Sequence, residues 1–261
     1  MDNDNVINLD DGGINKNPEP KVVKPTSAPS LRGRLDALLN GYSTEYYSFT
    51  LPSGKEIEIR PSVFEDEREA ALESQRLGIS LIEALERRVI KDFDPSKYPY
   101  YDELFILLKM RQISFGPKLE LKPVTCQHCS EENIGLIVEL DKLPVTIANP
   151  PLGGLIKEIT LPATGHKAKV RIPSISDGDI TNISQNNSNL FKLVVSIGEE
   201  SDPYIIKEFV NKGPIADVKA MKSVIFDSTY GVDTTVNFEC QHCRKVNTIM
   251  LPINLDFLPV S

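Results

Sequence analysis

Apolar positions recur at helix or strand spacing in several short stretches, and each stretch predicts a short element. Residues 31–41 carry four leucines on one helical face and end at Gly41, which is typical of a short amphipathic helix with a C-terminal glycine. Residues 46–60 place Ile57 and Ile59 between charged side chains after a Pro-Ser-Gly turn. This alternation predicts a β-hairpin with one buried face.

Helical spacing predicts further helices in both halves of the chain. Ser62 and Glu65 have the spacing of a capping box, with Ser62 as the N-cap of a helix that runs to about Glu73. Apolar residues at helical spacing predict four more helices, at residues 80–88, 101–115, 202–211 and 215–227. Together with the hairpin, these helices predict an α+β fold.

The same short motifs occur twice, in the same order. Cys-Gln-His-Cys stands at residues 126–129 and again at 240–243, and each copy precedes an extended run and the pattern Leu-Asp-x-Leu-Pro-Val. The other matching landmarks are the hairpin segments at residues 49–55 and 159–167 and the segments at residues 60–62 and 171–174. The offset is 110 residues at the hairpins and 114 at the cysteine pairs. Ordered landmarks at a nearly constant offset predict an internal duplication.

The duplication predicts how the chain is organised. Residues 1–30 are polar and have no apolar period, which predicts a disordered N-terminal tail. The first repeat unit then covers residues 31–147 and the second covers residues 155–261. Residues 148–154, rich in proline and glycine, are predicted to be a linker. Each unit is expected to contain a β-hairpin, helices, a C-x2-C turn and a strand.

Charge and composition restrict the classes of function. The 261 residues contain 29 Lys and Arg against 37 Asp and Glu, a formal net charge of −8 that opposes binding to nucleic-acid phosphates. No apolar run is long enough to span a membrane, and the N-terminal residues lack the pattern of a secretory signal. Only three histidines occur, and two of them lie inside the cysteine pairs, which leaves few candidates for a general base. We therefore expect a protein that is not an enzyme.

All four cysteines lie in the two C-x2-C pairs. Such a turn directs both sulfurs inward and supplies half of a tetrahedral thiolate site. A pseudo-twofold arrangement of the two repeat units would bring the pairs face to face. We therefore predict a zinc-ribbon-like centre with one structural zinc ion per chain, held by Cys126, Cys129, Cys240 and Cys243. Four protein ligands leave no open position for water, so this site would stabilise the fold and not catalyse.

Other uses of the cysteine pairs stay open at this level. The pairs could remain apart without a metal, carry out thiol redox chemistry, or hold iron or an iron–sulfur cluster. His128 or His242 could replace one thiolate, although a residue inside a tight C-x2-C turn normally points away from the metal. Stable disulfides are disfavoured, because cytosolic thiols stay reduced. His166, in the second hairpin turn, is interpreted as a surface histidine.

Three motifs together resemble a known family of phage proteins. They are the hairpin from Thr50 to Pro61, the helical sequence from Tyr101 to Gly116, and the C-x2-C turn with its following strand. In this order they resemble the baseplate hub and hub-assembly proteins of T-even-like contractile-tailed phages. The resemblance covers roughly residues 45–261, and the polar segment at residues 1–30 has no counterpart in the family pattern.

The resemblance implies a role in phage tail morphogenesis. Such proteins help to build the central hub of the baseplate in the host cytoplasm, and some are components of the virion. The expected partners are hub proteins of the same phage, with no catalytic residues, no nucleic acid and no membrane involved. Whether the chain is a hub component or an assembly chaperone, and its oligomeric state, stay open. Two alternatives stay open: a zinc-ribbon nucleic-acid-binding module, which the net charge opposes, and a hydrolase, which would require paired carboxylates in a cleft.

Overall fold

The computed structural model describes residues 31–39, 42, 44–178, 187–226, 229–251 and 257–258. The chain divides into two compact units, residues 1–42 and residues 43–261. In the smaller unit the predicted helix is present as α1 (Leu31–Leu39), and all four of its leucines are exposed. The tail predicted for residues 1–30 lies outside the described residues.

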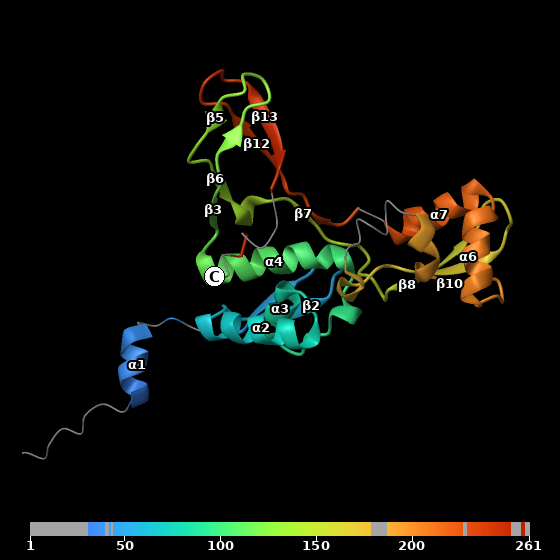
Figure 1. The fold of residues 1–261 in the computed structure, drawn as a ribbon, viewed down its shortest axis with the longest axis horizontal. Helices are drawn as coiled ribbons and strands as arrows, with labels where there is room; N and C mark the ends of the chain where they lie inside the picture. Colours follow the sequence, from blue (N-terminus) through green and yellow to red (C-terminus); the bar gives the residue numbers. More distant parts are fainter. Residues whose placement is uncertain are drawn as a thin grey trace, which may run out of the picture. The chain divides into compact units, whose positions relative to one another are not determined.

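The first half of the larger unit is built on the predicted β-hairpin. Strands β1 (Tyr47–Thr50) and β2 (Glu56–Ile59) pair antiparallel, and Ile90 then bridges to Ile59 of β2 (Figure 1). The helices of this half are α2 (Phe64–Leu77), α3 (Leu81–Val89) and α4 (Tyr100–Phe115). All three lie where helical spacing predicts them, although α2 continues past the expected end.

The start of α2 differs from the prediction by one residue. Its N-cap is Val63 and not Ser62, and the Val63 backbone N–H donates to the Asp66 carboxylate at 3.0 Å. Asp66 is fixed in this position because Arg60 donates two hydrogen bonds to it, at 2.7 and 2.8 Å. The charge-assisted bidentate pair therefore decides which acid caps the helix.

The second half repeats the combination of a small sheet and helices. Strands β8 (Ile156–Thr160), β9 (Lys167–Arg171) and β10 (Val194–Ile197) form an antiparallel sheet in the order β10-β9-β8. Helices α6 (Pro203–Lys212) and α7 (Ile215–Ile225) follow, both within the predicted ranges to within a residue or two. The Asp202 side chain caps α6 by accepting the Tyr204 backbone N–H at 2.8 Å.

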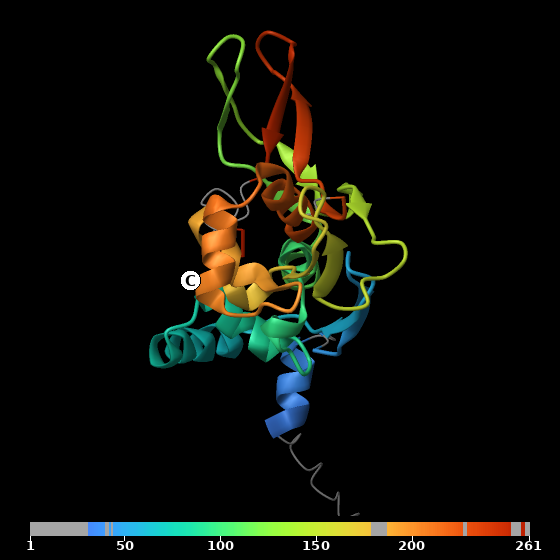
Figure 2. The same cartoon turned by 90° about the vertical axis from the view of Figure 1, so that its right-hand side faces the viewer.

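Several very short antiparallel ladders complete the larger unit. They pair β3 (Lys118–Glu120) with β6 (Ile137–Glu139), β4 (Val124–Thr125) with β5 (Glu132–Asn133), β7 (Val145–Thr146) with β11 (Gly231–Val232), and β12 (Thr235–Glu239) with β13 (Val246–Met250). The described 3₁₀ helices are η1 (Pro95–Lys97), η2 (Leu140–Lys142), η3 (Ile175–Asp177) and η4 (Asn187–Leu193). The β4–β5 and β12–β13 hairpins lie side by side in both views (Figures 1 and 2).

Three apolar clusters hold the larger unit together. The first packs the β1–β2 hairpin against α2, α3 and α4, and it includes Leu251 and Phe257 from near the C-terminus. The second fills the space among β8, β9, β10, α6 and α7. The third is small and joins Tyr101 of α4 to Leu152 and Ile172. Because Leu251 and Phe257 belong to the first cluster, packing of the first half depends on the end of the chain.

An arginine–aspartate pair recurs in both halves. Arg60 and Asp66 have a counterpart in Arg171 and Asp177, which are joined by two hydrogen bonds of 2.6 and 2.8 Å. In each case the aspartate also accepts the backbone N–H of the residue three positions before it. Both pairs therefore fix the chain where it leaves the hairpin.

A contact between a hairpin turn and a helix also recurs. The Ser53 backbone N–H donates to Asp102 of α4 at 2.9 Å, and those of Ala163 and Thr164 donate to Asp217 of α7 at 2.7 and 3.2 Å. Both carboxylates are buried. Burial raises the pKa of Asp102 to about 6, despite its contact with Ser53. Burial also opposes ionisation of Asp217, but the donors of its turn outweigh this effect and lower its pKa.

Glu86 of α3 is buried in an unusual way for a carboxylate. Its residue surface is 0 % exposed, and neither carboxylate oxygen has a hydrogen-bond partner among the described residues. Burial raises the pKa of Glu86 well above its usual 4.5, and the charges of Glu103 and Glu83 raise it further. The folded chain therefore keeps this carboxyl protonated over a wider pH range than the unfolded chain does.

We predict that Glu86 makes the folded chain less stable as the pH rises. Above the unfolded-state pKa, unfolding releases a proton from Glu86, so the free energy of unfolding falls with pH until the raised folded-state pKa is passed. Glu86→Gln should reduce this slope, leaving stability near pH 4 almost unchanged and increasing it at pH 8. Urea denaturation at several pH values measures the slope. The exposed Glu199→Gln, away from Glu86, is the control, and an identical slope in wild type and Glu86→Gln would contradict the prediction.

Candidate metal centre

Each C-x2-C pair is held in a tight turn between two short strands. We call residues 126–131 the first knuckle and residues 240–245 the second knuckle. In the first, the Ser130 backbone N–H donates to the Cys126 carbonyl at 3.0 Å, and in the second the Arg244 N–H donates to the Cys240 carbonyl at 3.1 Å. Ser130 and Arg244 both adopt left-handed backbone angles, with φ of 63° and 61°. The two knuckles therefore have the same backbone conformation.

The two knuckles bring all four sulfurs together. The Sγ atoms of Cys126, Cys129, Cys240 and Cys243 lie within 4.8 Å of one another. Two contacts cross between the knuckles, each with Sγ atoms 3.7 Å apart: Cys126 to Cys243 and Cys129 to Cys240. A zinc ion with metal–sulfur distances of about 2.3 Å requires sulfurs about 3.8 Å apart at the corners of a tetrahedron. The cluster could therefore hold a metal ion, and its two crossed distances are those of tetrahedral thiolate ligands.

Two buried asparagines lock the knuckles to each other. Asn247 of β13 accepts the Gln127 backbone N–H of the first knuckle at 2.8 Å. In the reverse direction, Asn133 of β5 accepts the Gln241 backbone N–H of the second knuckle at 2.7 Å. Gln127 is 114 positions before Gln241, and Asn133 is 114 positions before Asn247. The contacts are therefore reciprocal, as at a two-fold interface.

The side chains inside the two C-x2-C loops follow the same reciprocal scheme. The Gln127 amide donates to the Thr248 carbonyl at 3.1 Å, and the Gln241 amide donates to the Ile134 carbonyl at 2.9 Å. The Nε2 atom of His128 lies 3.2 Å from the Val246 carbonyl, and that of His242 lies 3.0 Å from the Glu132 carbonyl. Both imidazoles therefore use Nε2 to contact the opposite strand, and neither is required as a metal ligand in place of a cysteine. The contacted carbonyls belong to Thr248, Ile134, Val246 and Glu132.

The charge on the sulfur cluster depends on its surroundings. Burial disfavours the Cys126 thiolate, but two backbone N–H groups of its own turn outweigh this and lower the pKa to about 6. Backbone N–H groups of the second knuckle likewise lower the pKa of Cys240. The Glu131 N–H lowers the pKa of Cys129, but burial and the neighbouring sulfurs raise it to about 12. The cluster therefore resists four negative charges unless a cation is present.

Sequence spacing identifies the four cysteines but not the groups that position them. Cys126 and Cys240 are buried, and Cys129 and Cys243 are partly exposed. Asn133 and Asn247, which join the knuckles, were not singled out by spacing, although each stands seven residues after the first cysteine of its pair. Because both asparagines are almost wholly buried, at 0 % and 1 % exposed, their contacts are part of the core of the centre.

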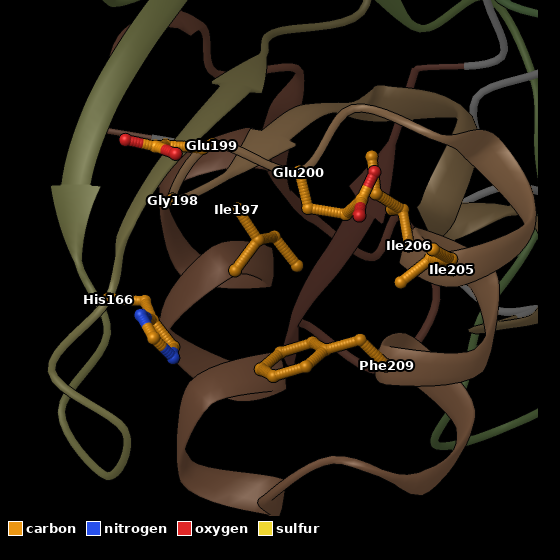
Figure 3. A pocket seen from close by; sticks show the side chains of 8 residues that line it. All are labelled: His166, Ile197, Gly198, Glu199, Glu200, Ile205, Ile206 and Phe209. Atoms are coloured by element: carbon orange, nitrogen blue, oxygen red, sulfur yellow. The ribbon is translucent and has the colours of Figure 1, made fainter.

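A cavity of about 630 Å³ lies between the β8–β9 turn, the end of β10 and α6 (Figure 3). Its apolar lining consists of Ile197, Ile205, Ile206 and Phe209. The exposed His166 lies beside Phe209, and Glu200 lies across the cavity from it (Figure 3). The Glu200 carboxylate accepts the backbone N–H groups of Ser201 and Asp202 at 2.9 and 2.8 Å. Glu200 therefore supports the start of α6, and the cavity is mainly an apolar surface.

A family model matches most of the chain. It is described as T4 bacteriophage base plate protein, and it covers residues 44–259, which include both knuckles and exclude α1. Comparison with curated proteins and with solved structures gives no significant match. Among the described residues, no helix combines the length and apolar character needed to cross a membrane.

We predict that the two crossed asparagines contribute equally to stability. Asn247→Ala leaves the Gln127 backbone N–H without its acceptor and removes a buried side chain, so the free energy of unfolding should fall by about 1–3 kcal/mol. Asn133→Ala should cause a similar loss through Gln241. Denaturation in urea measures both, with the exposed Asn237→Ala on the neighbouring strand as control. Losses no larger than that of the control would show that the crossed contacts do not stabilise the centre.

Proposed function

The chain belongs to the family of T4 bacteriophage base plate proteins, and we propose that it acts in tail morphogenesis as a non-enzymatic component or assembly factor of the baseplate hub. The family match over residues 44–259 is the observation that carries this proposal. Membership supports a structural role in the phage tail baseplate. Hub assembly would take place in the host cytoplasm, and the chain would then either remain in the virion or be released.

We also propose that residues 31–147 and 155–261 derive from one duplicated unit, joined by residues 148–154. The support is that equivalent residues make equivalent contacts in both halves. The Arg60–Asp66 pair matches Arg171–Asp177, and the reciprocal asparagine contacts have a constant offset of 114 residues. Duplication accounts for these matches more simply than independent origin does, because two unrelated kinds of contact, an ion pair and an asparagine contact, are each repeated in both halves.

The proposed ligand set is one structural zinc ion held by Cys126, Cys129, Cys240 and Cys243. The two inter-knuckle sulfur distances of 3.7 Å support tetrahedral thiolate coordination. The ladders beside the knuckles support a structural role, because β4 and β5 have only two residues each and would be marginal alone. When bound, the zinc would neutralise the thiolates and hold the knuckles together.

A scaffold of this kind would act through its surfaces. Several large apolar side chains of the larger unit are more than 70 % exposed: Phe64, Tyr204, Ile215 and Met250. Exposed apolar side chains supply contact area for protein partners, whereas the net charge of −8 would repel nucleic acid. The proposed partners are therefore hub proteins of the same phage.

We predict about one zinc ion per purified chain. Cys240→Ser should lose the metal and lower the unfolding temperature by on the order of 10 °C, because metal binding is coupled to folding. His242→Ala is the matched control and should keep the metal, since the His242 ring contacts a carbonyl. Elemental analysis and thermal denaturation measure both quantities. Metal-free wild-type protein with the same stability as Cys240→Ser would contradict the proposed centre.

We predict that the chain binds hub proteins and not DNA. Mixed with purified hub proteins of its own phage, it should elute earlier in size-exclusion chromatography as a stable complex. Mobility of a short DNA duplex should not change at low salt, where electrostatic binding is strongest. A salt-dependent DNA shift without any hub complex would favour the nucleic-acid-binding module instead.

A further inference from the structure

Two close sulfur contacts join cysteines of different knuckles. Cys126 lies 3.7 Å from Cys243, and Cys129 lies 3.7 Å from Cys240, measured between Sγ atoms. Each of these pairs combines a buried cysteine with a partly exposed one. A small oxidant can therefore reach one sulfur of each pair from solvent. The other sulfur of the pair is buried in the opposite knuckle.

We propose that this centre is also an oxidative cross-linking site, in which loss of the metal is accompanied by two disulfides, Cys126–Cys243 and Cys129–Cys240. The inference extends the proposed thiolate centre, since it assigns the fate of the same four sulfurs under oxidising conditions. The Cys126–Cys243 disulfide spans 117 positions and the Cys129–Cys240 disulfide spans 111. The two halves of the chain therefore remain covalently linked after the ion has left.

The chemistry requires a peroxide as oxidant. The sulfur of partly exposed Cys129 attacks one peroxide oxygen, the O–O bond breaks, and the products are a sulfenic acid and hydroxide, which takes a proton to become water. The thiolate of Cys240 then attacks this sulfur, the S–O bond breaks, and a second water leaves after protonation. Cys243 and Cys126 react in the same way. Two peroxides are reduced to four waters, four thiolates are oxidised to two disulfides, and the zinc ion is released as a dication.

The knuckle contacts favour crossed pairing over pairing within a knuckle. A disulfide needs sulfurs about 2.05 Å apart, so each crossed pair has to close by less than 2 Å. The contacts from Gln127 to Asn247 and from Gln241 to Asn133 do not involve the metal, so they keep the knuckles opposed once it leaves. Crossed pairing joins sulfurs of opposed knuckles that already lie 3.7 Å apart.

Such a site suits a protein that passes from a reducing to an oxidising environment. Thiols stay reduced in the cytosol, where the metal-bound form would prevail, and disulfides persist outside the cell. The metal joins the two halves in the first environment and the crossed disulfides join them in the second. The physical requirement is the same in both, because the short β4–β5 ladder needs its partner.

Peptide mapping of the full, zinc-loaded chain tests this directly. Trypsin places the first pair in residues 119–142 and the second pair in residues 223–244, so crossed disulfides join two separate peptides. After treatment with two equivalents of hydrogen peroxide, non-reducing mass spectrometry should show the joined peptides lacking four hydrogens. A chromogenic chelator should report one zinc ion released per two disulfides.

Two other outcomes would overturn the inference. Separate peptides that each lack two hydrogens would show pairing within each knuckle, and sulfinic acids without disulfides would show that no sulfur resolves the first oxidation. The metal content measured before peroxide is added tests the proposed zinc centre independently. A chain that holds zinc but forms disulfides within each knuckle would support the zinc centre and contradict the crossed disulfides. A metal-free chain that forms crossed disulfides would contradict the zinc centre and support the crossed pairing.

Two matched controls connect the pairing to the fold. Oxidation of the urea-unfolded chain should favour pairing within each C-x2-C sequence, because short loops close most easily. Cys129→Ser/Cys240→Ser leaves Cys126 and Cys243, which should cross-link, whereas Cys129→Ser/Cys243→Ser leaves two buried sulfurs and should react about tenfold more slowly. Equal rates in the two double variants would contradict the assigned pairs. If either variant fails to fold, partial reduction and differential alkylation of the joined wild-type peptides assigns the two disulfides.

Discussion

The junction between the two knuckles is the contact on which the rest of the larger unit depends. Neither knuckle has an apolar core of its own, and β4 and β5 are only two residues long. Ladders of this length are not stable alone in water. What holds them is each other: four clustered sulfurs and the reciprocal contacts of Asn133 and Asn247. The backbone N–H groups of Gln127 and Gln241 find these acceptors only when both knuckles are present.

The position of the knuckles in the chain extends this local junction to the whole unit. The first knuckle follows α4 through β3, and β13 after the second knuckle leads to Leu251 and Phe257 in the first apolar cluster. A chain segment of more than 100 residues is therefore closed at two neighbouring places, by the knuckles and by that cluster. Closing a long loop twice costs little more entropy than closing it once, so each contact lowers the cost of the other.

Buried and partly buried carboxylates differ in how many hydrogen-bond donors surround them. Asp66 and Asp177 each accept hydrogen bonds from an arginine and from a backbone N–H. Asp217 accepts hydrogen bonds from the turn between β8 and β9, beginning with the Ala163 backbone N–H. Asp102 has a donor at one oxygen only, and Glu86 has none among the described residues. The same order describes how strongly each position favours a charged carboxylate, because hydrogen bonds offset the loss of hydration. The first three hold loops in place, and the last two are where protonation matters.

Local patterns in the sequence determined the helices, the hairpins and the four cysteines, because each depends on spacing within a short segment. Leucine and isoleucine periodicity located α4 and β2, and the C-x2-C spacing identified the four cysteines that the fold gathers. The tertiary structure decided what meets across long separations. Local spacing could not reveal that Asn133 and Asn247 cross, nor that Asp66 and not Glu65 caps α2, because those choices depend on partners elsewhere. Glu86, within a run of charged residues on α3, looks solvent-facing in sequence, and only the packing of α3 against its neighbours buries it.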